Sequence, residues 1–241
     1  MTTRSTGRDC VTLLAFDFDG TLAPIQDDPA RVVLDPAAAE FLAEAARAPG
    51  VVVAIASGRD SEDLASRLDG LPVYLIASHG LEIRGPYGRS IRSARPLALE
   101  LDESIRRAAE ACGLRIEKKT HGIALHWRGV RSLHPAHPVV EQFRHWAASN
   151  GLDVIDGRRV VEARMQGWGK DAALRWVSSA TAAGRVIFAG DDVTDFGALQ
   201  FAVEHGRGLF MRSDECVPPP GVTVVNSCED LVRILRDEVP V

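Results

Sequence analysis

The sequence predicts an α/β protein built on a Rossmann-like, doubly wound parallel sheet. Short apolar runs that fit buried strands alternate with stretches of helical length, first at Val11–Phe16, Val51–Ala56 and Val73–Ala77. Near-continuous apolar strands separated by helices are typical of parallel sheets that are covered on both faces. Several of these strands end in acidic or small polar residues, and open α/β sheets bind their ligands at that edge.

Two helices and a short antiparallel pair complete the first part of the chain. Asp35 and Pro36 indicate the start of the first helix, because proline suits the first helical turn. The Ala- and Glu-rich body of this helix is followed by Pro49 and Gly50, which stop it. The predicted ranges are 37–48 and 60–68 for the helices, and 78–84 with 89–92 for the pair.

The pattern then changes to helix, two strands, helix, two strands, which predicts a small α+β unit inserted into the α/β domain. We expect a core domain of residues 1–95 and 165–241 and an inserted unit of residues 96–164. Inside the insertion the predicted helices are 97–112, with Gly113 as C-cap, and 138–149, and the predicted strands are 115–119, 122–127, 153–155 and 159–163. After it the core pattern returns, with helices 171–180, 195–204 and 230–237 and strands 185–189, 209–211 and 222–225.

The amino-acid composition limits which binding partners and which cellular compartment are expected. The 241 residues are 46% hydrophobic, which allows a sizeable core, and carry a net charge of −5. This acidic balance argues against nucleic-acid and membrane-surface binding, but not against a small anion beside a metal. The four cysteines lack C-x-x-C spacing, so neither a zinc site nor a disulfide framework is expected. Because the polar N-terminus has no signal core and no long apolar run follows, we expect a soluble cytoplasmic protein. We also expect it to be a monomer.

Two acids, Asp17 and Asp19, stand directly after the first predicted strand, and Gly20 then allows a sharp turn. Carboxylates two residues apart on an extended segment point the same way, because the strand period is two. Such a pair repels itself unless a cation or a proton lies between the two groups, and hard oxygen ligands suit Mg²⁺. The alternative interpretation is an ordinary turn with solvated acids.

Three further patches lie where predicted core strands end or helices begin, so we expect all of them at the same rim. Ser57-Gly58-Arg59 offers a hydroxyl and free backbone N–H groups that suit phosphate oxygens, although serine is also a common N-cap. Lys170 stands at a helix start and, taken alone, is equally well explained as a solvated lysine. Three acids crowd one turn, which favours metal binding over a chance cluster: Asp191, Asp192 and Asp195.

The segment D-F-D-G-T-L after an apolar strand resembles the nucleophile motif of the haloacid dehalogenase-like phosphatases. The four patches also occur in the order and spacing of that superfamily's motifs, from about Val11 to about Leu235. The resemblance implies that Asp17 attacks phosphorus to form an aspartyl phosphate, and that Asp19 protonates the leaving oxygen and later takes a proton from water.

The same resemblance implies roles for the other motif residues and names Mg²⁺ as the cofactor. The metal would be held by Asp17, the main-chain carbonyl of Asp19, and Asp191, with Asp192 and Asp195 holding metal-bound water. Ser57 and Lys170 would bind the phosphoryl oxygens whose charge spreads in the transition state. Thr21 would donate to the phosphate or orient its loop.

Within the insertion, Glu117-Lys118-Lys119 and the segment 122–128 are similar to the E-x-K and A-x-H-y-R segments of trehalose 6-phosphate phosphatases. Two further stretches support this family: residues 78–84 resemble its S/N-H-G-x-E segment, and 160–164 before Gly169-Lys170 resemble its V-E-x-R…K-G stretch. The resemblance implies that the insertion is a cap that closes over a sugar phosphate, most specifically trehalose 6-phosphate in trehalose biosynthesis.

By that resemblance Glu117, Lys119 and Glu162 would bind sugar hydroxyls from the cap, which suits carboxylate and ammonium groups. Arg59 and His79 join Thr21 as candidate substrate-binding residues, although His79 is equally well explained by its turn. Lys118 is expected to be an ordinary solvated residue, and His134 and His137 are expected to be structural.

One departure from the family pattern bears on the substrate. The family usually continues its fourth motif as G-D-D-x-T-D-E-D-A-F, and here Phe196-Gly197 replaces the Glu-Asp pair. A related glycosyl or pseudo-disaccharide phosphate therefore remains an alternative substrate. Two other interpretations are a non-catalytic sugar-phosphate sensor, against which the complete acid set argues, and a phosphotransferase that passes the phosphoryl group to another sugar.

Overall fold

The computed structural model describes residues 10–26, 28–127, 130, 136–157, 159–213 and 216–239. Two residues considered above lie outside these ranges: His134, and Arg128 at the end of the A-x-H-y-R segment. The chain divides into two compact units, one of residues 1–92 with 170–241 and the other of residues 93–169. We refer to them as the core unit and the inserted unit.

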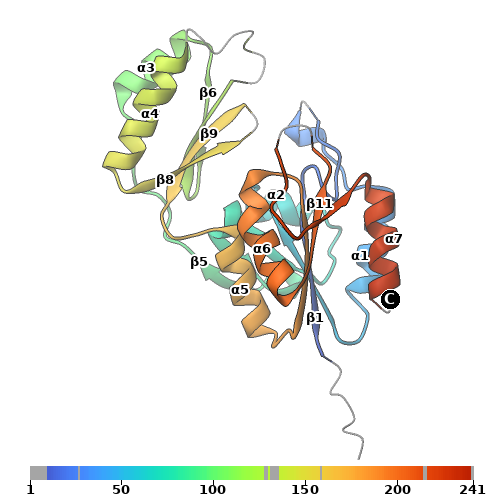
Figure 1. Cartoon of the computed structure of the whole chain (residues 1–241). Helices are drawn as coiled ribbons and strands as arrows, with labels where there is room; N and C mark the ends of the chain where they lie inside the picture. The colour runs from blue at the N-terminus through green and yellow to red at the C-terminus, as the bar shows by residue number, and fades with distance from the viewer. Residues whose placement is uncertain are drawn as a thin grey trace, which may run out of the picture. The chain divides into compact units, whose positions relative to one another are not determined.

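The core unit is built on an eight-stranded sheet of order β12-β11-β10-β1-β2-β3-β4-β5 (Figure 1). The first six strands in this order run parallel, and β4 pairs antiparallel with β3, next to the edge strand β5. The predicted doubly wound parallel sheet is therefore confirmed. The strands are β1 (Thr12–Asp17), β2 (Val51–Ala56), β3 (Tyr74–Ala77), β4 (Glu82–Arg84), β5 (Ser90–Ser93), β10 (Arg185–Gly190), β11 (Gly206–Met211) and β12 (Thr223–Val225).

Helices cover both faces of this sheet, with α1 and α7 on one side and α5 and α6 on the other (Figure 1). Alternating side chains of β1 divide between the two layers: Leu14 and Phe16 join the apolar cluster with α1 and α7, whereas Leu13 and Ala15 join that with α5 and α6. The helices are α1 (Pro36–Ala45), α2 (Ser61–Ser66), α5 (Lys170–Ala180), α6 (Phe196–His205) and α7 (Cys228–Glu238).

The ends of the core elements follow from local capping chemistry. The Asp35 carboxylate accepts hydrogen bonds from the backbone N–H groups of Ala37 and Ala38, at 2.8 and 3.4 Å, and Pro36 is the first helical residue of α1. Ser78–Gly80, expected to begin a strand, instead forms a tight turn, labelled η2, because Ser78 and His79 both adopt left-handed backbone angles that a strand does not have. Two further short 3-10 segments are η1 (Pro29–Arg31) and η3 (Pro86–Gly88).

The inserted unit has a four-stranded antiparallel sheet of order β6-β7-β9-β8, with α3 and α4 packed on one face (Figure 1). Its apolar core gathers around Phe143 of α4, which is fully buried with Ile105 of α3 and Leu125 of β7 nearby in the same cluster. The elements are α3 (Glu103–Ala111), β6 (Arg115–Lys119), β7 (Gly122–His126), α4 (His137–Ser149), β8 (Leu152–Gly157) and β9 (Val160–Met165).

Helix α3 begins later than the sequence suggested. The Asp102 carboxylate accepts from the backbone N–H of Ser104 at 2.8 Å and so caps the helix there. Upstream, the backbone N–H of Leu97 donates to the carbonyl of Thr120 at 2.8 Å, which ties this segment to the turn between β6 and β7. The expected helix over 97–112 is therefore wrong in its first six residues.

Candidate functional site

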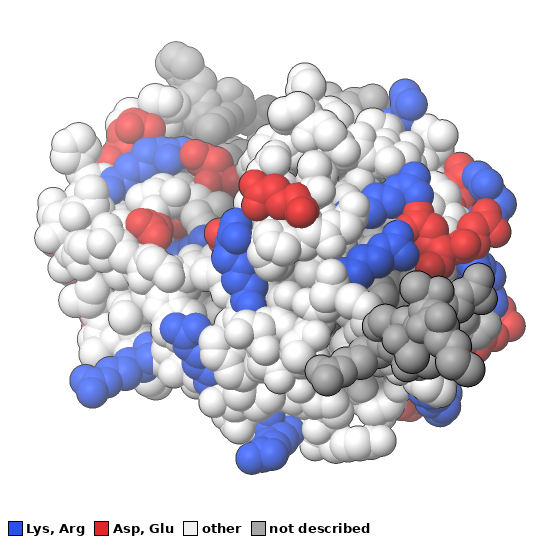
Figure 2. All heavy atoms as spheres, turned by 60° about the horizontal axis from the view of Figure 1, so that its bottom comes forward, with Lys and Arg blue, Asp and Glu red and all other residues white. Residues whose placement is uncertain are grey.

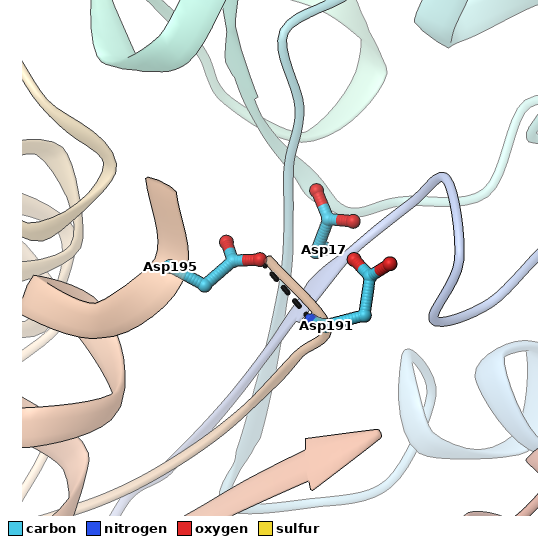
Figure 3. Close-up of side chains that lie close together, drawn as sticks. All are labelled: Asp17, Asp191 and Asp195. Atoms are coloured by element: carbon cyan, nitrogen blue, oxygen red, sulfur yellow. Dashed lines mark hydrogen bonds between the residues drawn. The ribbon is translucent and has the colours of Figure 1, made fainter. Parts of the chain in front are cut away.

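Three carboxylates come together where β1 and β10 end. Asp17 is the last residue of β1, Asp191 follows β10, and Asp195 closes the short 3-10 helix η5 (Val193–Asp195). One oxygen from each lies within 4.8 Å of the others, and Figure 3 shows the three carboxylates turned toward one another. The pairing of β1 with β10 aligns Phe16 with Ala189, so the parallel register itself brings these strand ends together.

Lys170, the first residue of α5, places an ammonium group inside this acid cluster. Its Nζ donates to Asp17 Oδ1 at 2.5 Å and to Asp195 Oδ1 at 2.8 Å, and the residue is only 4% exposed. The second oxygen of Asp195 accepts from the backbone N–H groups of Asp191 and Asp192, each at 3.2 Å. Figure 3 shows the bond from Asp191. Because both Asp195 oxygens are engaged by the fold, Asp17 and Asp191 are the better candidates for direct ligation of a cation.

The electrostatics of the cluster also favour a cation. Burial raises the pKa of Asp17 well above its ordinary value; Lys170 opposes this rise, while Asp195 and Asp191 add to it. Burial, with the Asp195 charge next, raises the pKa of Asp191 to about 7. One ammonium does not balance three crowded carboxylates, and an all-oxygen donor set suits a hard divalent ion.

Two glycines let the loops of this site approach each other. Gly20 has φ +90°, and a Cβ atom there would lie 2.0 Å from Asp191 Oδ2. A Cβ on Gly190 would lie 2.5 Å from the Asp195 Cγ. Real Cβ atoms do not approach other atoms so closely, so any side chain at either position would displace an acid of the cluster.

Asp19 does not join the three acids, contrary to the expectation that its carboxylate would point the same way as that of Asp17. Strand β1 ends at Asp17 and the chain bends at Phe18, so the period of two no longer applies at Asp19. The Asp19 carboxylate instead accepts two hydrogen bonds from Arg59, from Nε at 2.7 Å and from Nη2 at 2.6 Å. Its side chain is 37% exposed, so it remains open to solvent.

The loops after β2 and β3 bring Ser57 and His79 together. Ser57 is buried, and its hydroxyl accepts from the backbone N–H of Arg59 at 3.1 Å while its carbonyl accepts from the His79 N–H at 2.8 Å. The His79 ring lies against Gly58, where a Cβ would be 2.5 Å from Nε2. The Thr21 hydroxyl, next to Gly20, is buried without a hydrogen-bond partner among the described residues, which suits an oxygen-rich ligand.

In the inserted unit, strand register gathers the predicted sugar-binding residues on one face of the sheet. Glu117, Ala124 and Glu162 lie opposite one another on β6, β7 and β9, and Lys119, Gly122 and Arg164 form the next row. The Lys119 ammonium donates to the Glu162 carboxylate. The other face carries the apolar residues that pack on α3 and α4, so the two faces are chemically distinct.

Lys118 and Glu117 have different surroundings although they are neighbours in sequence. Lys118 points to the opposite face and pairs with exposed Glu100, in keeping with an ordinary surface role. Glu117 Oε2 lies 2.6 Å from Nε2 of His126, and this hydrogen bond lowers the pKa of Glu117 to about 2. His137 is the first residue of α4, away from the polar rows.

The sequence interpretation assigned no role to four residues that lie around the predicted ones. Asp63 accepts hydrogen bonds from Arg59 and also from Arg67, Phe18 lies beneath the Arg59 guanidinium, and His126 lies within hydrogen-bond distance of Glu117. The spacing Arg59-x₃-Asp63-x₃-Arg67 is the i, i+4 pattern of ion pairs along a helix, and this was the available signal for the first two. Phe18 and His126 both lie inside the quoted motifs, but their partners could not be predicted because these contacts depend on the tertiary fold.

The class of the protein follows from this arrangement of sheet and site. Superposition gives a TM-score of 0.77 with the C-terminal domain of Candida albicans trehalose-6-phosphate phosphatase, at 19% identity over 95% of this chain and 92% of that one. A haloacid dehalogenase-like hydrolase from Bacteroides thetaiotaomicron gives 0.71, at 16% identity over 94% and 98% of the two chains. The fold is that of the haloacid dehalogenase-like hydrolases.

Sequence comparison narrows the class to a family. The family model described as trehalose-phosphatase matches residues 15–209. A trehalose-phosphate phosphatase from Mycobacterium marinum is 33% identical over 214 residues, which cover 83% of this chain and 54% of that protein. The chain belongs to the trehalose-phosphatase family, and the resemblance drawn from its motifs is confirmed at that level.

The chain spans only part of the curated relatives that it matches. It covers about half of the M. marinum protein, and 16% of a Mycobacterium tuberculosis protein described as an uncharacterized glycosyl hydrolase, to which it is 34% identical over 225 residues.

None of the described helices is long and apolar enough to cross a membrane. On the face drawn in Figure 2, acidic and basic side chains lie interspersed among uncharged ones.

Proposed function

We propose that this protein is a Mg²⁺-dependent phosphatase that hydrolyses trehalose 6-phosphate to trehalose and phosphate through an aspartyl-phosphate intermediate, as a step of trehalose biosynthesis. The observation that carries the proposal is the set of buried Asp17, Lys170 and Asp195 with half-buried Asp191 at the ends of β1 and β10. A buried charged cluster at the ligand edge of an α/β sheet is costly for a structural role alone, and family membership supports the reaction class.

The residues present fit a magnesium ion. Asp17, the main-chain carbonyl of Asp19, and Asp191 would hold it, with Asp192 and Asp195 orienting bound water. When bound, the ion offsets the repulsion between an anionic nucleophile and an anionic phosphate. Asp195 helps to position Asp191, because its carboxylate accepts hydrogen bonds from the backbone of the Asp191–Asp192 turn.

The chain's own residues account for both half-reactions. An Asp17 oxygen attacks phosphorus while the bond to the sugar oxygen breaks, and Asp19 gives that oxygen its proton. Asp19 then takes a proton from water, which attacks the aspartyl phosphate, releases phosphate and frees Asp17. Lys170 and Ser57 hold the phosphoryl oxygens, and the buried Thr21 hydroxyl donates to one of them.

The sugar would be recognised by the polar face of the inserted unit. Glu117, Lys119 and Glu162 lie in adjacent rows around the small residues Gly122 and Ala124, which leave room above the sheet. Carboxylates accept and the ammonium donates hydrogen bonds, so together they suit a ligand with many hydroxyl groups. Binding energy from the distal sugar would then be used to reach the closed, reactive state.

A related glycosyl or pseudo-disaccharide phosphate is the second candidate substrate, because Phe196-Gly197 replaces the family's usual acidic pair. Phe196 packs edge-on against Phe210, with ring centroids 6.2 Å apart. A Cβ on Gly197 would lie 3.1 Å from the Asp171 Cβ, so this glycine permits the close approach of α6 to α5. Within the core unit, the pair serves helix packing.

The deciding experiment is phosphate release from a panel of sugar phosphates, each assayed with Mg²⁺ and with EDTA. We expect Mg²⁺-dependent release from trehalose 6-phosphate well above that from other glycosyl phosphates. Preference for another glycosyl phosphate would keep the mechanism and change the substrate. Transfer of the phosphoryl group to a labelled sugar acceptor would identify a phosphotransferase, and tight binding with no release from any compound would identify a sensor.

We expect Glu117→Gln and Glu162→Gln to lower kcat/KM for trehalose 6-phosphate by about 10- to 100-fold, since each removes a charged hydrogen-bond acceptor for the sugar. Slow hydrolysis of a generic aryl phosphate, which carries no sugar, should stay within about twofold of wild type. Lys118→Gln, on the other face of the sheet, is the matched control. Equal losses on both substrates would contradict a role in sugar recognition.

A further inference from the structure

We propose that Arg59 is a positioning residue for Asp19, and that it fixes the orientation of this carboxylate for proton transfer rather than binding the substrate itself. The proposal rests on the proposed phosphatase function, in which Asp19 is the acid and base. It replaces the sequence-based expectation that Arg59 contacts the substrate.

Arg59 and Asp19 form a bidentate ion pair, in which the planar guanidinium faces both oxygens of the carboxylate; this arrangement is called the fork below. Nε of Arg59 donates to Asp19 Oδ2 at 2.7 Å and Nη2 donates to Oδ1 at 2.6 Å, so both carboxylate oxygens are held at once. Two parallel hydrogen bonds define the plane of the carboxylate as well as its position, which a single bond does not. Asp19 needs this support because it lies beyond the end of β1.

Arg59 is itself held on its other sides. Its Nη1 donates to Asp63 Oδ2 at 2.7 Å, and its guanidinium carbon lies 5.5 Å from the centroid of the buried Phe18 ring. Three of its five N–H donors are therefore committed to two carboxylates. The Arg59 side chain is 11% exposed and that of Asp19 is 37% exposed, so Asp19 is the member of the pair that solvent and substrate reach.

A second arginine extends the support along α2. Arg67 donates from Nη2 to Asp63 Oδ1 at 2.6 Å and from Nε to both Asp63 oxygens at 3.1 Å. It also donates from Nη1 to the carbonyl of Val32, in the loop that precedes α1. Asp19 is thus connected through alternating charges to a helix and a loop of the core unit, which is the connectivity expected of a positioning element.

The test separates the two half-reactions by using two leaving groups. A sugar alkoxide needs a proton when it leaves, whereas p-nitrophenolate does not, but the hydrolysis of the phosphoenzyme needs Asp19 with either substrate. For Arg59→Lys, which keeps the charge but not the fork, we expect kcat on trehalose 6-phosphate to fall about 100-fold with KM within about threefold of wild type. With p-nitrophenyl phosphate we expect a burst at the wild-type rate followed by slow turnover, because the phosphoenzyme accumulates.

A double-mutant cycle shows whether Arg59 acts through Asp19. In an Asp19→Asn background, Arg59→Lys should change kcat by less than about twofold, since the group to be positioned is already disabled. Asp63→Asn, which leaves the fork intact but removes its support, should give a smaller loss than Arg59→Lys. Arg233→Lys is the matched control, because Arg233 is exposed and pairs only with Asp230 among its described contacts.

Three outcomes would overturn the proposal. A rise in KM on both substrates, with weaker inhibition by inorganic phosphate, would make Arg59 a phosphate-binding residue. An undiminished effect of Arg59→Lys in the Asp19→Asn background would show that it does not act through Asp19. Thermal unfolding in EDTA tests the pair without turnover: the melting-temperature losses of the two single variants should not add in the double variant, and additive losses would contradict the coupling. Failure of the phosphatase proposal would appear separately, as absence of release by the wild-type protein.

Discussion

Asp17→Asn is expected to abolish phosphate release, with kcat reduced by at least about 10⁴-fold. The substitution removes the attacking oxygen anion but keeps the size of the side chain and an oxygen that accepts from Lys170 Nζ. Lys170 retains its bond to Asp195, so the core unit should fold as before. Steady-state phosphate release from trehalose 6-phosphate with saturating Mg²⁺ measures the effect.

The control for this substitution is Asp237→Asn on the exposed side of α7, which should retain full activity. The circular dichroism spectrum of Asp17→Asn should overlay that of wild type. Retention of more than about a tenth of wild-type kcat would mean that another group attacks phosphorus, because the loss of an essential nucleophile costs far more than that.

Lys170→Met should have the largest effect on stability. The buried ammonium is the partner of both Asp17 and Asp195, and its loss leaves three crowded carboxylates, two of them buried, without a positive charge beside them. Breaking a buried ion pair by removing one partner costs about 3–5 kcal/mol of unfolding free energy. Chemical denaturation of the full-length protein in EDTA measures this loss of unfolding free energy. Mg²⁺ should restore part of it, because the ion supplies the missing positive charge.

The pH dependence of this loss has a definite sign. The pKa of Asp17 is raised in the folded protein, and that of Asp191 is raised to about 7, so the folded state holds protons that the unfolded state releases. The stability that these protons provide is full below the ordinary carboxyl pKa and is lost as pH rises through the folded value. The deficit of Lys170→Met should therefore be larger at pH 8 than at pH 5.

The matched control is Lys118→Met, because Lys118 is exposed and its pair with Glu100 lies at the surface. Water and salt screen an exposed pair, so little change in unfolding free energy is expected. A deficit for Lys170→Met no greater than that of Lys118→Met, or one that vanishes at pH 8, would show that the ammonium does not balance the acid cluster.

Local sequence patterns predicted much of the core unit and of the acid cluster at the carboxyl ends of its strands. The run Val51–Ala56 is β2 without change, and Asp35 caps α1 as its position before Pro36 indicated. Parallel strands present their carboxyl ends at one edge, so acids that follow β1 and β10 meet there whatever the details of the loops. The meeting of Asp17 with Asp191 and Asp195 is a consequence of this topology.

Two features could not be predicted from the sequence: the start of α3 and the partner of Asp19. The first involves two competing sequence patterns, and the second depends on a contact between residues far apart in the chain. Leu97, Leu99 and Leu101 alternate with a period of two, which fits an extended segment, yet their helix-forming composition favoured an early start of α3. The pair of Asp19 with Arg59 joins residues 40 positions apart through a bend at Phe18, and no local rule gives that bend. Side-chain partners of this kind are set by packing, not by spacing.

The boundary between the two units falls directly before Lys170. The inserted unit ends at Gly169, and the next residue is the ammonium fixed by Asp17 and Asp195. For protein engineering this defines a junction. Under the proposed function, we expect a chimaera that exchanges residues 93–169 for the equivalent segment of a relative to change sugar selectivity while keeping the lysine of the host. A graft that runs one residue further replaces that lysine with the donor's, and we then expect selectivity and chemistry to be exchanged together.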